Sequence, residues 1–283
     1  MRVHVALTPA EPTPFALDGS AVIVIDVLRA TTTVVAACTA GCLGVIPVAD
    51  TDAARAVAAD FPRDAVVLGG ERGGEPIAGF DLGNSPTEYT AERVGGRTII
   101  LTTTNGTSAM KRAGLARASA AAALTNVGAA ADWAFTQGRH VTVLCAGDDG
   151  ALSLEDAVCA GLLVQRMAAR APGVKLSDAA VVASRLAEYY RERLGEVRRD
   201  SRWARRLHPA TTLVVAEAVL AVRDEMAWSL TDVLRRRLPL LLIQPPERSL
   251  IKDLGDLLGP IWRRDSFEII NEFEADQRNT LKR

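Results

Sequence analysis

Acidic, basic and hydroxyl side chains gather directly after an apolar segment near the start of the chain. Residues 21–25 read Ala-Val-Ile-Val-Ile, and residues 26–33 read Asp-Val-Leu-Arg-Ala-Thr-Thr-Thr. Because such an apolar run predicts a strand buried on both faces, its carboxyl end would present Asp26, Arg29 and three threonines at the start of a helix. Carboxylates bind divalent cations and guanidinium groups clamp oxyanions. The stretch therefore predicts a site for a phosphorylated substrate and a cation.

A second cluster is rich in glycine. Residues 69–75 read Gly-Gly-Glu-Arg-Gly-Gly-Glu, and residues 79–86 follow as Gly-Phe-Asp-Leu-Gly-Asn-Ser-Pro. Glycines let backbone amides approach an anion closely, while Glu71 offers a cation ligand and Arg72 a clamp. The same composition is equally typical of a flexible surface loop.

Two further clusters also follow apolar segments. Residues 102–108, Thr-Thr-Thr-Asn-Gly-Thr-Ser, fit either phosphate binding or a plain helix N-cap. In residues 145–156, Ser153 and Asp156 have the spacing of a capping pair, which is the interpretation that this cluster favours by itself. As metal ligands, Glu155 and Asp156 would need a partner carboxylate such as Asp26.

The elements that must position these clusters alternate between short β-branched runs and alanine-rich stretches, which predicts an α/β fold with parallel strands. Strands that end near Ile25, Leu101 and Leu144 each lead into a polar turn, so the three turns could converge on one cleft. After about Val164 the sequence becomes typical of helices and rich in arginine. Such a charged stretch most often forms the solvated face of a helix. We expect strands at 21–25, 44–48, 65–68, 97–101 and 140–144, and helices at 50–60 and 108–112.

Spacing argues against several other chemistries. Leu28 occupies the place where an aspartyl-phosphate mechanism of the two-carboxylate type needs its acid, and Ala151 stands where a thiolate phosphatase with Cys145 needs arginine. His140 is followed by valine, which disfavours a phosphohistidine mechanism. The chain has neither a GxxxxGK[ST] loop nor GxGxxG after its first buried strand. With three histidines in all, a metal would be held by oxygen, which points to Mg²⁺.

The bulk composition narrows the partners. A net charge of −1 and a pI of about 6.3 provide no global field that would attract nucleic acid or an acidic membrane surface. No apolar run reaches membrane-spanning length, so the expected location is cytoplasmic. The expected partners are a small anionic phosphorylated substrate and, as an open alternative, a second copy of the chain. The four cysteines, without CxxC spacing, are expected to be reduced core thiols: Cys38, Cys42, Cys145 and Cys159.

Together these motifs resemble the 2-phosphosulfolactate phosphatase family. The resemblance covers about residues 1–207 and rests on the clusters above, in the same order, with Cys159-Ala160-Gly161 after Glu155-Asp156. It implies a three-layer α/β/α fold with a mostly parallel sheet. It also implies a Mg²⁺-dependent phosphomonoester hydrolase that converts 2-phosphosulfolactate to sulfolactate and phosphate, a step in coenzyme M biosynthesis. A related small phosphorylated acid is the alternative substrate.

Within that resemblance we assign roles to the residues of the shared motifs. Asp26, Glu155 and Asp156 are expected to bind the metal. The expected catalytic residues are Asp26, Arg29, Glu71 and Arg72, with the two arginines clamping phosphate and sulfonate. The remaining positions are expected to bind substrate: Thr31, Thr32, Asn84, Ser85, Thr103, Asn105, Gly106 and Thr107.

The resemblance stops near His208, and residues 208–283 are expected to form a divergent, mainly helical region. Residues 208–243 instead look like part of the C-terminal domain of FAD-dependent glycerol-3-phosphate dehydrogenases, or like a plain amphipathic helix with a basic face. No flavin-binding fingerprint stands upstream, so dehydrogenase activity is not expected. Two alternatives to an enzyme remain: an anion-binding module with a compromised site, and an interaction protein with an arginine-rich tail. Turnover distinguishes the first of these from the enzyme.

Overall fold

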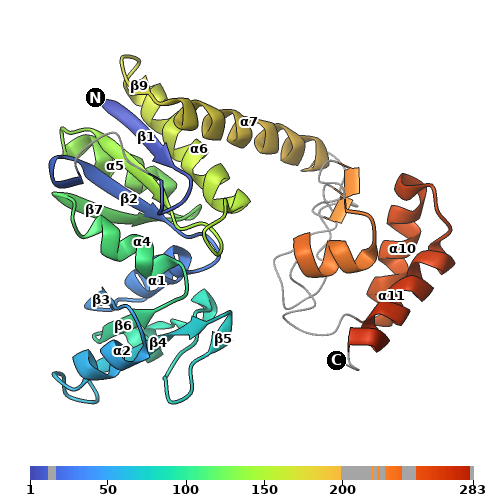
Figure 1. Ribbon diagram of the computed structural model, residues 1–283, viewed down its shortest axis with the longest axis horizontal. Coiled ribbons are helices and arrows are strands. Elements are labelled where there is room, and N and C mark those ends of the chain that lie inside the picture. The colour runs from blue at the N-terminus through green and yellow to red at the C-terminus, as the bar shows by residue number, and fades with distance from the viewer. Residues whose placement is uncertain (12–16, 199–217, 220–221, 224–226, 238–246, 281–283) are drawn as a thin grey trace. The chain divides into compact units, whose positions relative to one another are not determined.

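The computed structural model describes the chain except for residues 12–16, 199–217, 220–221, 224–226, 238–246 and 281–283 (Figure 1). It divides into two compact units, Met1–Tyr189 and Tyr190–Arg283. The division falls within a single helix, α7 (Asp178–Arg198). The boundary expected between residues 207 and 208 lies outside the described residues.

The first unit contains a parallel five-stranded sheet in the order β7-β2-β8-β1-β9. Its inner strand β2, between β7 and β8, is buried at all five residues, as the apolar run predicted. Ile25 at its carboxyl end pairs with Ala122 on one side and Cys145 on the other. The polar turns that follow β2 and β8 therefore begin at the same level of the sheet. The strands are β1 (Arg2–Ala6), β2 (Ala21–Ile25), β7 (Ala118–Ala122), β8 (Val141–Cys145) and β9 (Lys175–Leu176).

A second sheet of four strands, in the order β3-β6-β4-β5, lies in the same unit. The pairs β3–β6 and β4–β6 are parallel, whereas β4 and β5 form an antiparallel hairpin. The mostly parallel fold class is thus confirmed, with the strands divided between two sheets. These strands are β3 (Gly44–Pro47), β4 (Val66–Arg72), β5 (Glu75–Pro76) and β6 (Thr98–Thr102).

Helices cover both faces of each sheet. Ile23 and Ile25 of β2 pack with residues of α5 and α6, whereas Val22 and Val24 pack with Ala109 of α4. In the second sheet, α1 packs on one face and α2 on the other. The three-layer α/β/α arrangement is therefore confirmed. The helices are α1 (Ala30–Thr39), α2 (Thr51–Ala58), α3 (Ala91–Val94), α4 (Gly106–Ala113), α5 (Val127–Thr136) and α6 (Leu154–Arg170), with short 3-10 turns at Leu17–Gly19 and Pro86–Glu88.

The second unit is helical in its described parts, as expected for the C-terminal region. The helix α10 (Arg248–Trp262) packs on α11 (Ser266–Thr280), and a π-helical turn spans Asp232–Arg237. Leu254, Leu258 and Phe273 belong to a core of its own. The indole nitrogen of Trp262 donates to the carbonyl of Ala227 at 2.7 Å, which fixes the end of α10 against the preceding segment.

The burial of the cysteines agrees only in part with the prediction. All four cysteines are free, and Cys145 and Cys159 are buried as expected. Cys38 is exposed, so the expectation of four core thiols was wrong for this residue, which lies at the solvent-facing end of α1.

Across the described residues, no helix combines the length and apolar character needed to cross a membrane.

Candidate active site

The turn after β2 is folded around Asp26. Its carboxylate Oδ1 accepts a hydrogen bond from the Ala30 amide at 3.0 Å, and its backbone carbonyl accepts from the Thr31 hydroxyl at 2.7 Å. The Thr31 hydroxyl in turn accepts from the Asp26 amide at 2.9 Å. These bonds seat an acidic side chain at the first turn of α1, where the helix macrodipole favours negative charge. Asp26 is only 7% exposed.

The threonines of this turn bond mainly to the backbone. The Thr32 hydroxyl donates to the Val27 carbonyl at 2.6 Å, and the Thr33 hydroxyl donates to the Asn84 carbonyl at 3.0 Å. Because the Thr31 hydroxyl donates to Asp26, the hydroxyl protons of all three threonines are used in hydrogen bonds within the protein. The structure thus gives Thr31 and Thr32 a role in shaping the turn that carries Asp26, and it brings Asn84 beside α1.

Asp156 joins three segments of the site. Its Oδ1 accepts from the Val27 amide at 2.8 Å, and its Oδ2 accepts from the Gly147 amide at 3.2 Å. The capping pair expected from sequence was wrong, because Ser153 makes no side-chain capping bond to α6. The carboxylate of Asp156 points instead to the turns after β2 and β8, since those turns contain the amides that it satisfies.

Glu71 performs a similar role between the glycine-rich hairpin and the loop after β6. Its Oε1 accepts from the Thr104 amide at 2.7 Å, and its Oε2 accepts from the Gly74 amide at 2.7 Å and the Thr104 hydroxyl at 3.0 Å. The hairpin is thus fixed by its acidic residue and is not a free surface loop. Thr104 was not among the expected site residues; its place in the Thr-Thr-Thr run was the one signal for it.

The two candidate arginines differ in how firmly they are held. Arg72 donates to the Thr102 hydroxyl at 2.6 Å and to the Ala49 carbonyl at 3.0 Å, so its guanidinium is fixed at the carboxyl end of β6. Within the described residues, the guanidinium of Arg29 makes one long hydrogen bond, 3.5 Å to the carbonyl of Gly74 at the hairpin tip. Arg29 therefore keeps more of its five N–H donors available for an anion.

The loop after β6 packs directly against Asp26. An added Cβ at Gly106 would lie 2.4 Å from Asp26 Oδ2 and 2.4 Å from the Ala30 Cβ, so only glycine permits this approach. Thr103 and Thr107 bond to each other across the first turn of α4, with the Thr107 hydroxyl donating to the Thr103 carbonyl at 2.7 Å. The Asn105 amide group donates to Asp148 at 3.4 Å, which connects this loop to the turn after β8.

Two residues of the Gly-Asn-Ser-Pro segment complete the neighbourhood of α1. Asn84 is 5% exposed, and its side-chain oxygen is buried without a hydrogen-bond partner in the described part of the chain. Ser85 pairs its hydroxyl with that of Thr87 at 2.9 Å. A buried oxygen without a partner is costly, which makes Asn84 the more informative of the two as a candidate ligand-binding residue.

Four carboxylates lie close enough to interact electrostatically around the turns after β2, β4 and β8: those of Asp26, Glu71, Glu155 and Asp156. Burial raises the pKa of Asp26 to about 6, and repulsion from Glu71 and Glu155 adds to this effect, opposed by amide hydrogen bonds. Burial likewise raises the pKa of Asp156 to about 7, and Asp26 and Glu155 raise it further. Because burial and the neighbouring acids both oppose ionisation of Asp26 and Asp156, a bound cation would stabilise the ionised forms of these two residues.

The residues suit a magnesium ion that takes only some of its ligands from the protein. No three His, Cys, Asp or Glu side chains within the described ranges are already placed to enclose a metal. Magnesium keeps several waters and commonly binds through one or two carboxylates and a substrate phosphate. Asp26 and Glu155 suit that requirement, because their donors are hard oxygens, whereas both oxygens of Asp156 accept backbone hydrogen bonds.

Comparison with known proteins agrees with this set of motifs. The sequence model of the 2-phosphosulpholactate phosphatase family matches residues 6–215. This chain belongs to the 2-phosphosulfolactate phosphatase family. The family match extends past residue 207 and includes every residue of the carboxylate cluster. The resemblance of residues 208–243 to a dehydrogenase domain stays a prediction, and most of that stretch lies outside the described residues.

Individual members of the 2-phosphosulfolactate phosphatase family are similar over most of their length. A probable 2-phosphosulfolactate phosphatase of Gloeobacter violaceus is 44% identical over 187 residues, which cover 66% of this chain and 76% of the relative. The protein of the same name from Symbiobacterium thermophilum is 42% identical over 68% of this chain and 81% of its own. That of Thermotoga petrophila is 37% identical over 72% and 84%.

Proposed function

We propose that this protein is a magnesium-dependent phosphomonoester hydrolase whose substrate is 2-phosphosulfolactate. The observation that carries the proposal is the convergence of Asp26, Glu71, Glu155 and Asp156 beside Arg29. Hydrolysis of a highly anionic monoester requires positive charge at the phosphoryl oxygens and a positioned water. The names of the relatives supply the substrate.

The roles proposed for the residues follow from how each is held. Asp26 and Glu155 would bind the magnesium ion, which supplies positive charge to the phosphoryl oxygens when bound. Arg29 would bind phosphate, because among the described residues its guanidinium makes fewer hydrogen bonds than that of Arg72. Arg72, fixed beside Thr102, would bind the second acidic group of the substrate through its remaining donors.

The other two acids are proposed to position the site. Asp156 holds the turns after β2 and β8 at a fixed separation, and Glu71 holds the hairpin tip next to Arg29. A site held in this way binds its substrate with little loss of conformational freedom, which is the main contribution that positioning makes to catalysis. Asn105, Thr103 and Thr107 are proposed to complete the substrate cradle beside Gly106.

Phosphate release from a small panel of substrates tests the proposal. The full chain is incubated with 2-phosphosulfolactate and with 2-phospholactate, which lacks the sulfonate, in Mg²⁺ and in EDTA. We expect turnover that requires Mg²⁺ and a higher kcat/KM for the sulfonate-bearing substrate. Undiminished release in EDTA would contradict the metal assignment. Absence of release from both compounds by folded protein would favour an anion-binding module instead.

A further inference from the structure

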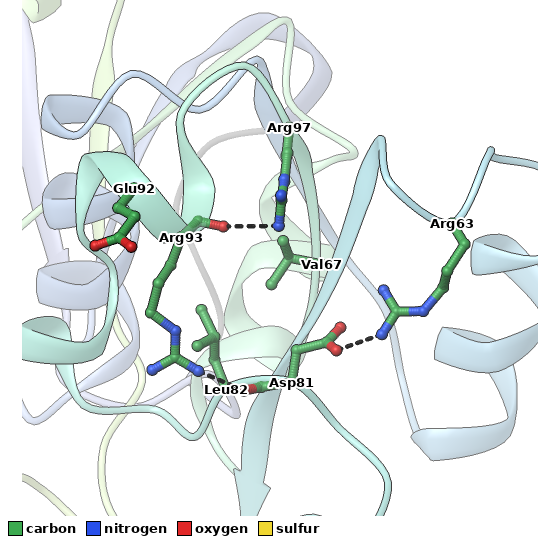
Figure 2. A pocket seen from close by; sticks show the side chains of 7 residues that line it. All are labelled: Arg63, Val67, Asp81, Leu82, Glu92, Arg93 and Arg97. Carbon is green, nitrogen blue, oxygen red and sulfur yellow. Dashed lines mark hydrogen bonds and ion pairs between the residues drawn. The ribbon is translucent and has the colours of Figure 1, made fainter.

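Three arginines surround a pocket on the second sheet that the proposed active site does not use. The pocket has a volume of about 340 Å³, and Val67 and Leu82 form its apolar floor, at 2% and 3% exposure. In Figure 2 the guanidinium groups of Arg63, Arg93 and Arg97 lie around these two side chains. An apolar floor with a cationic rim suits a small organic anion.

The positive charge of this pocket is only partly neutralised. Asp81 pairs with Arg63, and its other oxygen accepts from the Leu68 amide at 2.9 Å. Arg93 donates to the Asp81 carbonyl at 2.8 Å, and Arg97 donates to the Arg93 carbonyl at 3.3 Å. Among the described residues, neither Arg93 nor Arg97 has a carboxylate within ion-pair distance, although Glu92 also lines the pocket. Both keep N–H donors for a ligand.

The pocket is distinct from the carboxylate cluster because Val67 and Arg97 lie at the opposite ends of the same strands, while Leu82 lies beside Gly69 in the middle of β4. Val67 is the second residue of β4, and Arg97 directly precedes β6. Glu71 and Thr102 are at the carboxyl ends of these two strands. Glu71 lies four residue steps along the extended strand from Val67, which corresponds to about 13 Å. A ligand bound over Val67 would therefore not occupy the space beside Asp26.

We propose that this pocket binds a small organic anion with a phosphate or sulfonate group. The oxyanion would accept hydrogen bonds from Arg93 and Arg97, and the short carbon chain would contact the small exposed parts of Val67 and Leu82. Guanidinium groups match the geometry of tetrahedral oxyanions and bind them through paired hydrogen bonds. The volume is at the lower end of the range for small-molecule sites, which limits the ligand to a few carbon atoms.

Backbone amide NMR signals provide a local test. Isotope-labelled full chain is titrated separately with propane-1-sulfonate and with inorganic phosphate at constant ionic strength. We expect saturable shifts of the Val67, Leu82 and Arg97 amides, with propane-1-sulfonate binding more tightly than phosphate. In Arg97→Gln the same shifts should require at least about tenfold more ligand. Signals of Ala30 and Gly106 report separately on the proposed active site.

The control is Arg185→Gln, which removes one positive charge from an exposed ion pair on α7 and should bind like the wild type. Wild-type affinity in folded Arg97→Gln would overturn the proposal, as would the absence of saturable shifts at Val67 and Leu82. Tighter binding of phosphate than of propane-1-sulfonate would contradict the proposal that the ligand is an organic anion. If the wild-type protein shows the expected shifts at Val67 but releases no phosphate in the turnover assay, the proposed function is contradicted and the proposed anion pocket is still supported.

Discussion

Replacement of Asp26 by asparagine is expected to abolish most of the turnover while leaving the protein folded. Asparagine keeps the oxygen that accepts from the Ala30 amide at 3.0 Å but removes the negative charge proposed to bind magnesium. A group that stabilises charge at the reacting centre, directly or by holding a metal there, contributes about 10²- to 10⁴-fold to the rate. We therefore expect kcat for Mg²⁺-dependent phosphate release to fall by at least about 100-fold.

The same substitution should leave stability unchanged or raise it. Burial and the neighbouring carboxylates Glu71 and Glu155 oppose ionisation of Asp26, so a neutral amide relieves repulsion that the folded state bears at neutral pH without metal. Thermal unfolding of metal-free protein measures this effect. The matched control is Asp132→Asn on α5, whose carboxylate pairs with Arg170 at the surface; it should retain wild-type kcat. Full turnover by Asp26→Asn would contradict the assignment.

Gly106→Ala is expected to give the second large loss of activity. The added Cβ would lie 2.4 Å from Asp26 Oδ2 and 2.4 Å from the Ala30 Cβ, so either α4 or the Asp26 turn must move. A displacement of about 1 Å at a catalytic group costs roughly 100-fold in rate. We expect kcat/KM to fall by about that factor, with circular dichroism showing that the helices remain.

Gly44→Ala provides the control for this variant. A Cβ at Gly44 in β3 would meet no atom within 4 Å, so the same chemical change should leave kcat/KM close to that of the wild type. If Gly106→Ala also keeps wild-type kcat/KM, the loop after β6 does not constrain Asp26 in the way that its packing indicates. A matching loss in both variants would mean that the effect is not local to the site.

Apolar runs that lead into polar turns were enough to predict the strands that carry the site. All five expected strands are present. The bounds of β2 are as expected, and the ends of β3, β4, β6 and β8 are shifted by one to four residues. The strands β1, β5, β7 and β9 were not predicted. For β7 the reason is that Ala-Ser-Ala-Ala-Ala has little intrinsic preference for a strand. Its structure is imposed by pairing with β2 from Ala21 to Ile25, which no local pattern reveals.

The candidate residues were found by type, but their bonding depends on contacts that are distant in sequence. Asp156 bonds to the Val27 amide, 129 residues away, whereas the spacing to Ser153 indicated only a local cap. The hydroxyls after β2 were expected to face substrate, yet Thr31 and Thr32 bond to the backbone of their own turn. The arginines of the pocket in Figure 2 form no sequence motif, because the fold brings Arg63 next to Arg93 and Arg97 from a separate part of the chain.

The most direct test of the proposed site is a crystal structure with Mn²⁺ in place of Mg²⁺ and with inorganic phosphate as product. The anomalous scattering of manganese locates the metal independently of the protein coordinates. The account predicts manganese bound to the carboxylates of Asp26 and Glu155, with phosphate in contact with Arg29. Manganese bound elsewhere, with the Asp26 carboxylate in contact with neither ion, would contradict it.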